Sequence, residues 1–179
     1  MVQSIELLLD PAAEAAVRAD WDALAAAELP SLAAHLGPTN RPHITLLATE
    51  GGLEPAIPAL RRLLADVDLV TSIGAPLLFG GHRGRWVLVR QVVLTAALLE
   101  LHATIHDVVR DAAPPVDPDP LTRPDAWTPH VSIARRLPAA DLPAALPLLG
   151  LEPIPVRCTA VRLWDSPSAT VTGLTAGEG

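Results

Sequence analysis

Two short segments repeat the same residue characters at positions about half of the 179-residue chain apart. Residues 42–46 read PHITL and residues 129–133 read PHVSI, so each runs proline, histidine, β-branched aliphatic, hydroxyl, aliphatic. Each copy also follows a mainly helical stretch. Internal repetition of this kind is typical of two related structural units. The sequence therefore predicts two pseudo-symmetric lobes, each carrying one copy of the motif.

The alternation within each motif predicts how its side chains are distributed. Successive side chains of a β-strand face opposite ways, so His43 and Thr45 share one face while the aliphatic residues take the other. His130 and Ser132 are related in the same way. Each strand therefore presents an imidazole beside a hydroxyl, about 7 Å apart along the strand. Two such strands across a cleft would enclose a group of the size of a phosphate.

These residue types suit displacement at phosphorus. The attacking and leaving oxygens lie roughly in line, so one group must accept a proton while another donates one. Histidine can do either near neutral pH, because its reference pKa is about 6.5. The hydroxyls of Thr45 and Ser132 can donate hydrogen bonds to the non-bridging oxygens. The motifs therefore predict His43, Thr45, His130 and Ser132 as a catalytic set that requires no metal and no cofactor.

The remaining pattern favours an α+β fold with antiparallel sheets, made as one domain over residues 1–179. Strands and helices alternate, but hairpins are common and crossovers are short, which argues against a doubly wound parallel sheet. No Gly-rich phosphate loop follows any strand, so the usual P-loop and Rossmann motifs are missing. The expected strands are 5–9, 44–49, 68–79, 85–93 and 130–134, with a closing hairpin of 154–164 and 169–174. The expected helices are 11–36 (divided near Pro30), 55–65, 94–111 and 141–149.

Composition excludes several classes of function. The net charge is −7 and there are four Trp, one Phe and no Tyr, which argues against an extended nucleic-acid footprint or a base-stacking platform. No apolar run reaches the roughly 20 residues that span a bilayer, and the first residues read as a strand rather than a signal peptide. We therefore expect a cytoplasmic protein without membrane contact. The single cysteine, Cys158, reads as a buried strand thiol.

The motifs PHITL and PHVSI resemble the paired His-x-Thr/Ser-x motifs of the 2H phosphoesterase superfamily. The layout of nearly the whole chain, down to the terminal VRLWDSP segment, resembles its 2′-5′ RNA ligase-like (LigT) branch. The resemblance implies a bilobal fold around a central cleft and a metal-independent 2′,3′-cyclic nucleotide phosphodiesterase. The alternatives are an RNA 2′-5′ ligase and a non-catalytic nucleotide-binding module. The expected partner is a small cyclic nucleotide or an RNA terminus, and the expected state is a monomer.

The resemblance also suggests individual roles. Following the family, His130 is assigned as the base and His43 as the acid, although the residues alone do not choose between them. Members of the family often carry an arginine after the second motif, and Arg135 fits that place as a phosphate-binding residue. Strict alternation would turn Arg135 away from His130, so this role requires a bulge or the end of the strand. Trp127, shortly before the motif, is the best-placed candidate for stacking on a base, with core packing as the alternative.

Four other histidines invite simpler interpretations. His102 and His106 are four apart on a helix, which is half of a zinc-site spacing, but no third ligand is evident and an exposed helix face is favoured. His35 is expected at a helix C-terminus. His82 lies with Arg83 and Arg85 in a hairpin turn, for which a solvated turn is favoured over contact with phosphate.

Overall fold

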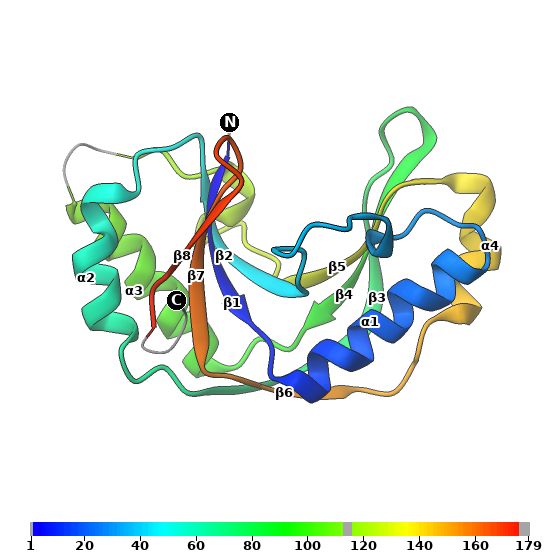
Figure 1. Ribbon diagram of the computed structural model, residues 1–179, viewed down its shortest axis with the longest axis horizontal. Coiled ribbons are helices and arrows are strands. Elements are labelled where there is room, and N and C mark those ends of the chain that lie inside the picture. The colour runs from blue at the N-terminus through cyan, green and yellow to red at the C-terminus, as the bar shows by residue number, and fades with distance from the viewer. Residues whose placement is uncertain (1, 113–115, 176–179) are drawn as a thin grey trace.

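The structure, a computed structural model, describes residues 2–112 and 116–175. Two four-stranded antiparallel sheets form its framework (Figure 1). The first sheet has the order β2 (His43–Thr49), β1 (Gln3–Leu8), β7 (Ala160–Asp165) and β8 (Thr170–Gly173). The second has the order β5 (His130–Pro138), β4 (Arg85–Val92), β3 (Leu69–Gly80) and β6 (Ile154–Cys158). The predicted bilobal α+β fold is confirmed, and each motif strand lies at the edge of its sheet.

Four α-helices flank the sheets: α1 (Pro11–Ala26), α2 (Ile57–Leu64), α3 (Ala96–Asp111) and α4 (Leu142–Ala145). Short 3₁₀ turns connect them: η1 (Leu32–Ala34), η2 (Glu54–Ala56), η3 (His82–Gly84), η4 (Pro120–Thr122), η5 (Ala139–Asp141) and η6 (Leu146–Leu148). Asp10 caps α1 by accepting hydrogen bonds from the backbone N–H groups of Ala12 and Ala13, as its place before Pro11 predicts. None of the helices in the described ranges is long and apolar enough to cross a membrane.

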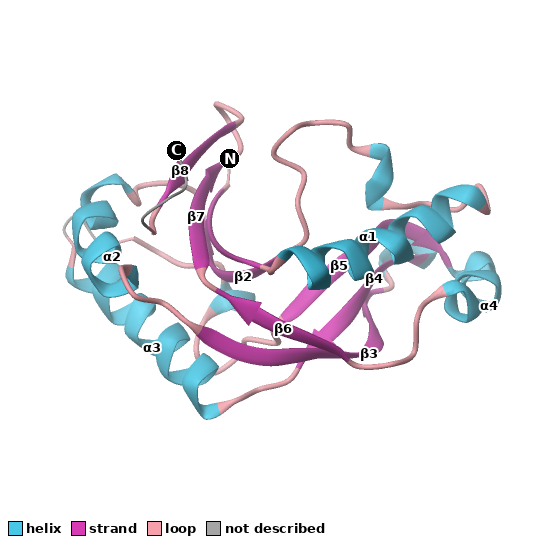
Figure 2. Cartoon of the chain, turned by 60° about the horizontal axis from the view of Figure 1, so that its bottom comes forward, coloured by secondary structure: helices cyan, strands magenta, loops and turns pink. Residues whose placement is uncertain are grey.

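The two lobes exchange helices. The units β1–α1–β2 and β4–α3–β5 have the same order, yet α1 packs against β5 and β6 of the second sheet, while α3 packs against β2 of the first. Figure 2 shows α2 and α3 beside the sheet that contains β1, with α1 and α4 beside the other. A buried ion pair strengthens the exchange, because Nη1 of Arg90 on β4 lies 3.2 Å from Oδ2 of Asp20 on α1. The lobes are therefore held together by elements that each contributes to the other.

Both motif strands contain a bulge at the same place. Glu6 pairs with Thr45 but Ile5 pairs with Leu47, so Leu46 is the extra residue of β2. In β5, Val89 pairs with Ser132 but Leu88 pairs with Ala134, so Ile133 is extra. A bulge resets the alternation of side chains along a strand. The residues after each bulge therefore face the opposite way from that predicted by an unbroken strand.

Three sequence expectations are wrong in detail. Residues 154–164 are not one strand: β6 joins the second sheet and β7 the first, so the closing hairpin is β7–β8 alone. The helix expected over 141–149 is reduced to α4 and its flanking turns, because Pro147 lacks the backbone N–H that would continue α4. His102 and His106 lie on the buried side of α3 rather than on an exposed face, being 1% and 8% exposed. Cys158 is buried, as predicted.

Candidate active site

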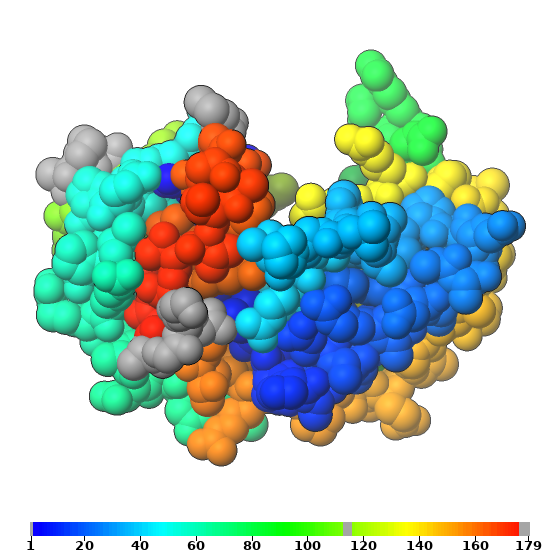
Figure 3. Space-filling view, viewed as in Figure 1, coloured from blue at the N-terminus to red at the C-terminus, as the bar shows by residue number. Residues whose placement is uncertain are grey.

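The hollow between the lobes carries the two motif strands (Figure 3). A cavity of about 450 Å³ on its first side is lined by His43, Ser132 and Arg135, together with Glu6 and Arg162. A second cavity of about 540 Å³ is lined by His130 and again by Ser132 and Arg135, with Phe79 and Leu121 among its apolar residues. Because the two cavities share residues of β5, they adjoin. The structure thus brings His43, His130, Ser132 and Arg135 around one space.

Both histidines are held in the same orientation by the backbone. Nδ1 of His43 lies 2.7 Å from the carbonyl oxygen of Arg41, and Nδ1 of His130 lies 2.7 Å from that of Thr128. A carbonyl oxygen can only accept, so each Nδ1 must carry the hydrogen. This leaves Nε2 of each ring as the atom that exchanges a proton. The proline before each histidine places the accepting carbonyl at the same position in both motifs.

The two hydroxyls are placed differently. Ser132 lines both cavities, whereas Thr45 is half-buried on β2 and lines neither. Within residues 2–112 and 116–175, no hydrogen bond involves either hydroxyl, so both remain able to donate to a ligand. The backbone beneath them is fixed in a symmetric way. The indole of Trp21 donates to the carbonyl of Ser132 at 3.0 Å, and that of Trp127 donates to the carbonyl of Thr45 at 2.9 Å.

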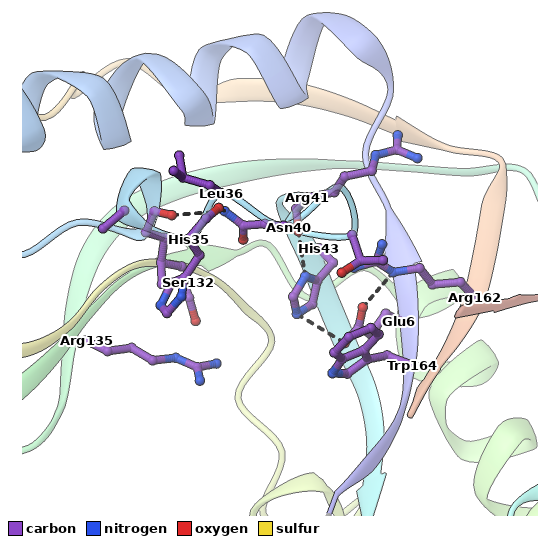
Figure 4. Close-up of a pocket in the computed structure, with 14 residues that line it drawn as sticks. Glu6, His35, Leu36, Asn40, Arg41, His43, Ser132, Arg135, Arg162 and Trp164 are labelled. Carbon is purple, nitrogen blue, oxygen red and sulfur yellow. Dashed lines mark hydrogen bonds and ion pairs between the residues drawn. The ribbon is translucent and has the colours of Figure 1, made fainter. Parts of the chain in front are cut away.

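A buried carboxylate lies beside the first histidine. Oε1 of Glu6 on β1 is 3.4 Å from Nε2 of His43 and accepts a hydrogen bond of 2.7 Å from Ser4. Its other oxygen accepts a 2.8 Å hydrogen bond from Nε of Arg162 on β7. Figure 4 shows the dashed interactions that run from His43 to Glu6 and on to Arg162, with Trp164 alongside. One oxygen of the Glu6 carboxylate is thus paired with a buried arginine, while the other faces His43.

The matching position in the second lobe carries no carboxylate. Glu6 stands opposite Thr45 in the β1–β2 pair, and the residue opposite Ser132 in the β4–β5 pair is Val89. The environment of His130 is instead positive and desolvated. Burial lowers the pKa of His130 and outweighs the hydrogen bond to Thr128, while the charges of His43 and Arg135 lower it further. The two imidazoles therefore have the same geometry but opposite electrostatic surroundings.

The bulge in β5 decides where Arg135 points. Alternation from His130 would have turned this side chain away, but the extra residue Ile133 resets the face. Arg135 is exposed and lines both cavities with Ser132 (Figure 4). A guanidinium in this position can bind phosphate oxygens in a bidentate manner. The sequence required a bulge for Arg135 to face the same way as His130, and the structure contains that bulge.

Trp127 lies behind the site rather than in it. Its ring stacks on His102 of α3, with centroids 3.8 Å apart and an interplanar angle of 4°. It packs against the hydrophobic core and lines neither of the two cavities. His102 in turn contacts the carbonyl oxygen of Thr122 at 3.0 Å through Nε2. The described position of Trp127 therefore suits support of β2 better than stacking on a base.

The segment between η1 and β2 closes the first cavity. It contributes His35, Leu36, Asn40 and Arg41 to the lining. Asn40 holds the segment by donating from Nδ2 to the carbonyls of Leu32 and His35 at 2.9 and 2.8 Å. His35 follows η1 rather than a full helix, and its exposed ring faces the cavity region in Figure 4.

The sequence alone does not identify several of these residues as part of the site. Glu6 and Arg162 each stand in an apolar strand, where a charged residue is a weak signal of a buried pair. His35, Arg41 and Trp164 become part of the site only through the fold. Among residues 2–112 and 116–175, no group of three or more His, Cys, Asp or Glu side chains is arranged to hold a metal ion.

The fold and the site define a class of protein. Two lobes around a cleft, each presenting a histidine and a hydroxyl from one strand, are the features that the resemblance to the 2H phosphoesterase superfamily implied. A family model described as the 2′-5′ RNA ligase superfamily matches residues 11–169. The chain belongs to this family, and its likeness to the LigT branch is confirmed. A comparison with curated protein sequences gave no match.

Solved structures with the same fold include three from different organisms. The protein TT0787 of Thermus thermophilus superposes with a TM-score of 0.63 at 16% identity, covering 97% of this chain and 95% of that one. Usb1 of Kluyveromyces marxianus gives 0.56 at 16% identity, with 97% of each chain covered. LigT of E. coli, complexed with 3′-AMP, gives 0.53 at 12% identity over 96% and 92% of the two chains.

Proposed function

We propose that this protein is a metal-independent phosphodiesterase that opens 2′,3′-cyclic phosphates of small nucleotides or RNA ends. The observation that carries the proposal is the pair of histidines with identical Nδ1 anchoring and opposite electrostatic surroundings. Opening a cyclic phosphate requires one proton acceptor and one proton donor on opposite sides of phosphorus. Two histidines in different surroundings can provide both. A LigT structure of the same fold contains 3′-AMP, which is a nucleotide of the expected size.

The surroundings of the two histidines support one assignment of their roles. His130 is neutral at neutral pH because burial and nearby cations lower its pKa, so its Nε2 acts as the base. Nε2 of His43 lies 3.4 Å from the Glu6 carboxylate, so we assign Nε2–H of His43 as the acid. This is the assignment that the family resemblance suggested. Its physical origin in this chain is the placement of Glu6 in one lobe and of Val89 at the matching position of the other.

These groups accept and donate the two protons that the reaction transfers. Nε2 of His130 takes a proton from water as the water oxygen forms a bond to phosphorus. The bond from phosphorus to one ribose oxygen breaks, and that oxygen receives the proton from Nε2 of His43. Ser132, which lines both cavities, donates to the non-bridging oxygens, and Arg135 offsets their charge. The product is a phosphomonoester with a free neighbouring hydroxyl. A second proton exchange with solvent restores both histidines.

The test is hydrolysis of a panel of 2′,3′-cyclic nucleoside monophosphates in excess chelator by wild type, His43→Ala and His130→Ala. We expect the wild type to turn over in chelator and each variant to lose a factor of about 10²–10⁴ in kcat. His82→Ala is the matched control, because His82 is exposed in the β3–β4 turn and should retain full activity. Near-normal turnover in both histidine variants would contradict the mechanism.

RNA 2′-5′ ligation is the second candidate, and the family match favours it by name. It uses the same proton transfers, with the 5′-hydroxyl of a second RNA in place of water as the nucleophile. Incubating one RNA that ends in a 2′,3′-cyclic phosphate with another that begins with a 5′-hydroxyl distinguishes the reactions by product length. Tight nucleotide binding with no product from either assay would indicate a non-catalytic binding module instead.

A further inference from the structure

The arginines of this acidic protein are unevenly paired. The chain has thirteen arginines and no lysine. Seven form ion pairs with carboxylates: Arg18, Arg41, Arg90, Arg110, Arg123, Arg157 and Arg162. The other six have no carboxylate partner among the described residues, and four of these lie in the β3–β4 turn, at the start of β4 or on β5: Arg83, Arg85, Arg135 and Arg136. Uncompensated positive charge is thus concentrated at one edge of the site.

Three of these arginines line a groove that opens from the active site. A cavity of about 610 Å³ is bordered by Arg85, Arg135 and Arg136 on one wall and by residues 28–35 on the other. We call this cavity the arginine groove. Arg135 also lines both cavities of the active site, so the groove and the active site share this guanidinium. Glu28 is the one carboxylate in the lining, and it forms no ion pair with the three arginines.

An irregularity in the backbone of β5 places Arg135 and Arg136 on the same wall of the groove. A regular strand would direct two successive side chains to opposite faces. In β5, however, Leu88 pairs with Ala134 and Trp86 pairs with Leu137, so Arg135 and Arg136 together oppose one residue of β4. Arg136 has φ = +59°, a left-handed conformation that is uncommon for a residue with a side chain. Strain of this kind is concentrated at functional positions, because the surrounding structure must maintain it.

The remaining contacts leave the guanidinium groups available. Nη1 of Arg85 donates to the carbonyl oxygen of Arg136 at 3.3 Å, which orients Arg85 along the groove. Neither Arg135 nor Arg136 donates a side-chain hydrogen bond to any of the residues described in the structure. Three guanidinium groups that line one cavity repel one another, and a bound anion would relieve that repulsion. Oxygens of a phosphate match the planar donor fork of arginine.

We infer that the arginine groove binds a second phosphate of the substrate, adjacent to the phosphate that reacts; this rests on the proposed function. The reacting phosphate lies at Ser132 and Arg135, and the next phosphate lies between Arg85 and Arg136. The preferred substrate is therefore a cyclic phosphate that carries another phosphate on its 5′ side. That phosphate belongs either to a 5′-phosphorylated nucleotide or to the preceding linkage of an RNA strand. The footprint is short, which agrees with the negative charge of the chain as a whole.

The experiment compares three substrates that differ on the 5′ side alone. They are adenosine 2′,3′-cyclic phosphate, the same nucleotide with a 5′-phosphate, and a dinucleotide that ends in adenosine 2′,3′-cyclic phosphate. We expect the second phosphate to raise kcat/KM of the wild type about tenfold or more, the effect of one charge-assisted hydrogen bond. The gain should shrink as salt concentration increases. Whether the monoester or the dinucleotide shows the larger gain identifies the source of the phosphate.

Two variants test the location of the site. Arg136→Gln and Arg85→Gln should reduce the ratio of kcat/KM between phosphorylated and unphosphorylated substrates toward one. The ratio is used because any general effect on folding or catalysis cancels from it. Arg62→Gln is the matched control, since Arg62 is an exposed arginine on α2 without a carboxylate partner among the described residues, and it should keep the ratio of the wild type. Arg136→Gln changes fewer contacts, because it keeps the backbone carbonyl of residue 136 to which Arg85 donates.

The outcomes separate this inference from the proposed function. If the wild type opens cyclic mononucleotides but a second phosphate gives no gain, or the gain persists in both variants, the inference is wrong and the proposed function stands. If no cyclic phosphate is opened, the proposed function is wrong. Calorimetry then decides the site by comparing adenosine 3′-monophosphate with adenosine 3′,5′-bisphosphate. Tighter binding of the bisphosphate by wild type than by Arg136→Gln supports the groove, and equal binding overturns it.

Discussion

Oε1 of Glu6 lies 3.4 Å from Nε2 of His43, whereas the corresponding position beside the second motif is occupied by Val89. The pseudo-twofold symmetry of the lobes is therefore broken beside one of the two histidines. A symmetric pair of histidines would have no preferred donor and no preferred acceptor. A single carboxylate makes the two surroundings unequal, and Arg162 forms a buried ion pair with that carboxylate.

Glu6→Gln tests this relationship, because it removes the charge with little change in shape. Nε2 of His43 then no longer faces a negative charge, so protonation of the leaving oxygen should become slower. We expect kcat at pH 8 to fall by about tenfold or more, within the range for a general acid. The measurement is a pH–rate profile of kcat with a cyclic nucleotide.

Glu50→Gln is the control for Glu6→Gln, since Glu50 is an exposed carboxylate that follows β2 in the same lobe. Its profile should match that of the wild type. Loss of Glu6 also leaves Arg162 without its partner, so some destabilisation is expected. A lower melting temperature with an unchanged kcat would mean that Glu6 has a structural role alone.

Arg135→Gln should affect the acidic limb of the profile. The positive charge of Arg135 helps to lower the pKa of His130, so the neutral base persists to lower pH in the wild type. Removing the charge raises that pKa, and the acidic limb of kcat/KM should move to higher pH. We also expect kcat/KM to fall by about 10- to 100-fold, because a charge-assisted contact to phosphate is lost.

Arg135→Lys separates the two effects of Arg135. Lysine keeps the charge, so the acidic limb should stay near its wild-type position, but it lacks the bidentate fork and should still lower kcat/KM. An acidic limb that moves equally in both variants would show that geometry rather than charge controls His130.

The sequence predicted the fold well because the repeated motif implies its symmetry. PHITL and PHVSI specify two strands with one buried face each, and the intervening helical stripes specify what covers them. The exchange of α1 and α3 between the lobes has no comparable signal. It depends on packing between segments far apart in the chain, such as the contact of Arg90 with Asp20.

The two motifs predicted the histidines and the serine of the candidate site, but not the residues around them. His43, His130 and Ser132 meet around the same space, and Arg135 joins them because of a bulge that alternation alone does not foresee. Glu6 was missed because a charged residue in an apolar strand gives no indication of its partner. His102 was misplaced because histidine is polar by residue type, yet an aromatic ring stacked on Trp127 can be buried when its nitrogen finds a carbonyl.

Trp127→Phe tests how β2 is supported behind the site. The indole donates a 2.9 Å hydrogen bond to the carbonyl of Thr45, and phenylalanine keeps the ring over His102 without the donor. An unsatisfied buried carbonyl should lower the free energy of unfolding by about 1–3 kcal/mol, measured by urea denaturation. Trp21→Phe should have a similar effect through Ser132. Trp164→Phe, which removes no internal hydrogen bond among the described residues, should cost less than either; equal losses in all three would contradict the hydrogen-bond account.

The buried pair His102 and His106 predicts acid sensitivity of the fold. Burial lowers the pKa of His102 from 6.5 to about 4, the nearby His106 acts in the same direction, and burial also lowers the pKa of His106. The unfolded chain therefore binds protons that the folded chain does not, between pH 6.5 and 4. Stability due to His102 is fully present above pH 6.5 and is lost as the pH falls through this window, by at most about 3 kcal/mol.

Urea denaturation at pH 7 and pH 4.5 measures this loss, and His102→Gln isolates the contribution of His102. The glutamine amide can still donate to the carbonyl of Thr122, but it does not titrate. The variant should be less stable than the wild type at pH 7, because the stacking on Trp127 is lost, and it should lose less stability on acidification. His82→Gln changes an exposed histidine and should keep the full pH dependence. If His102→Gln lost as much stability as the wild type between the two pH values, protonation of other groups would have to account for the acid sensitivity, because the neutral state of His102 would no longer explain it.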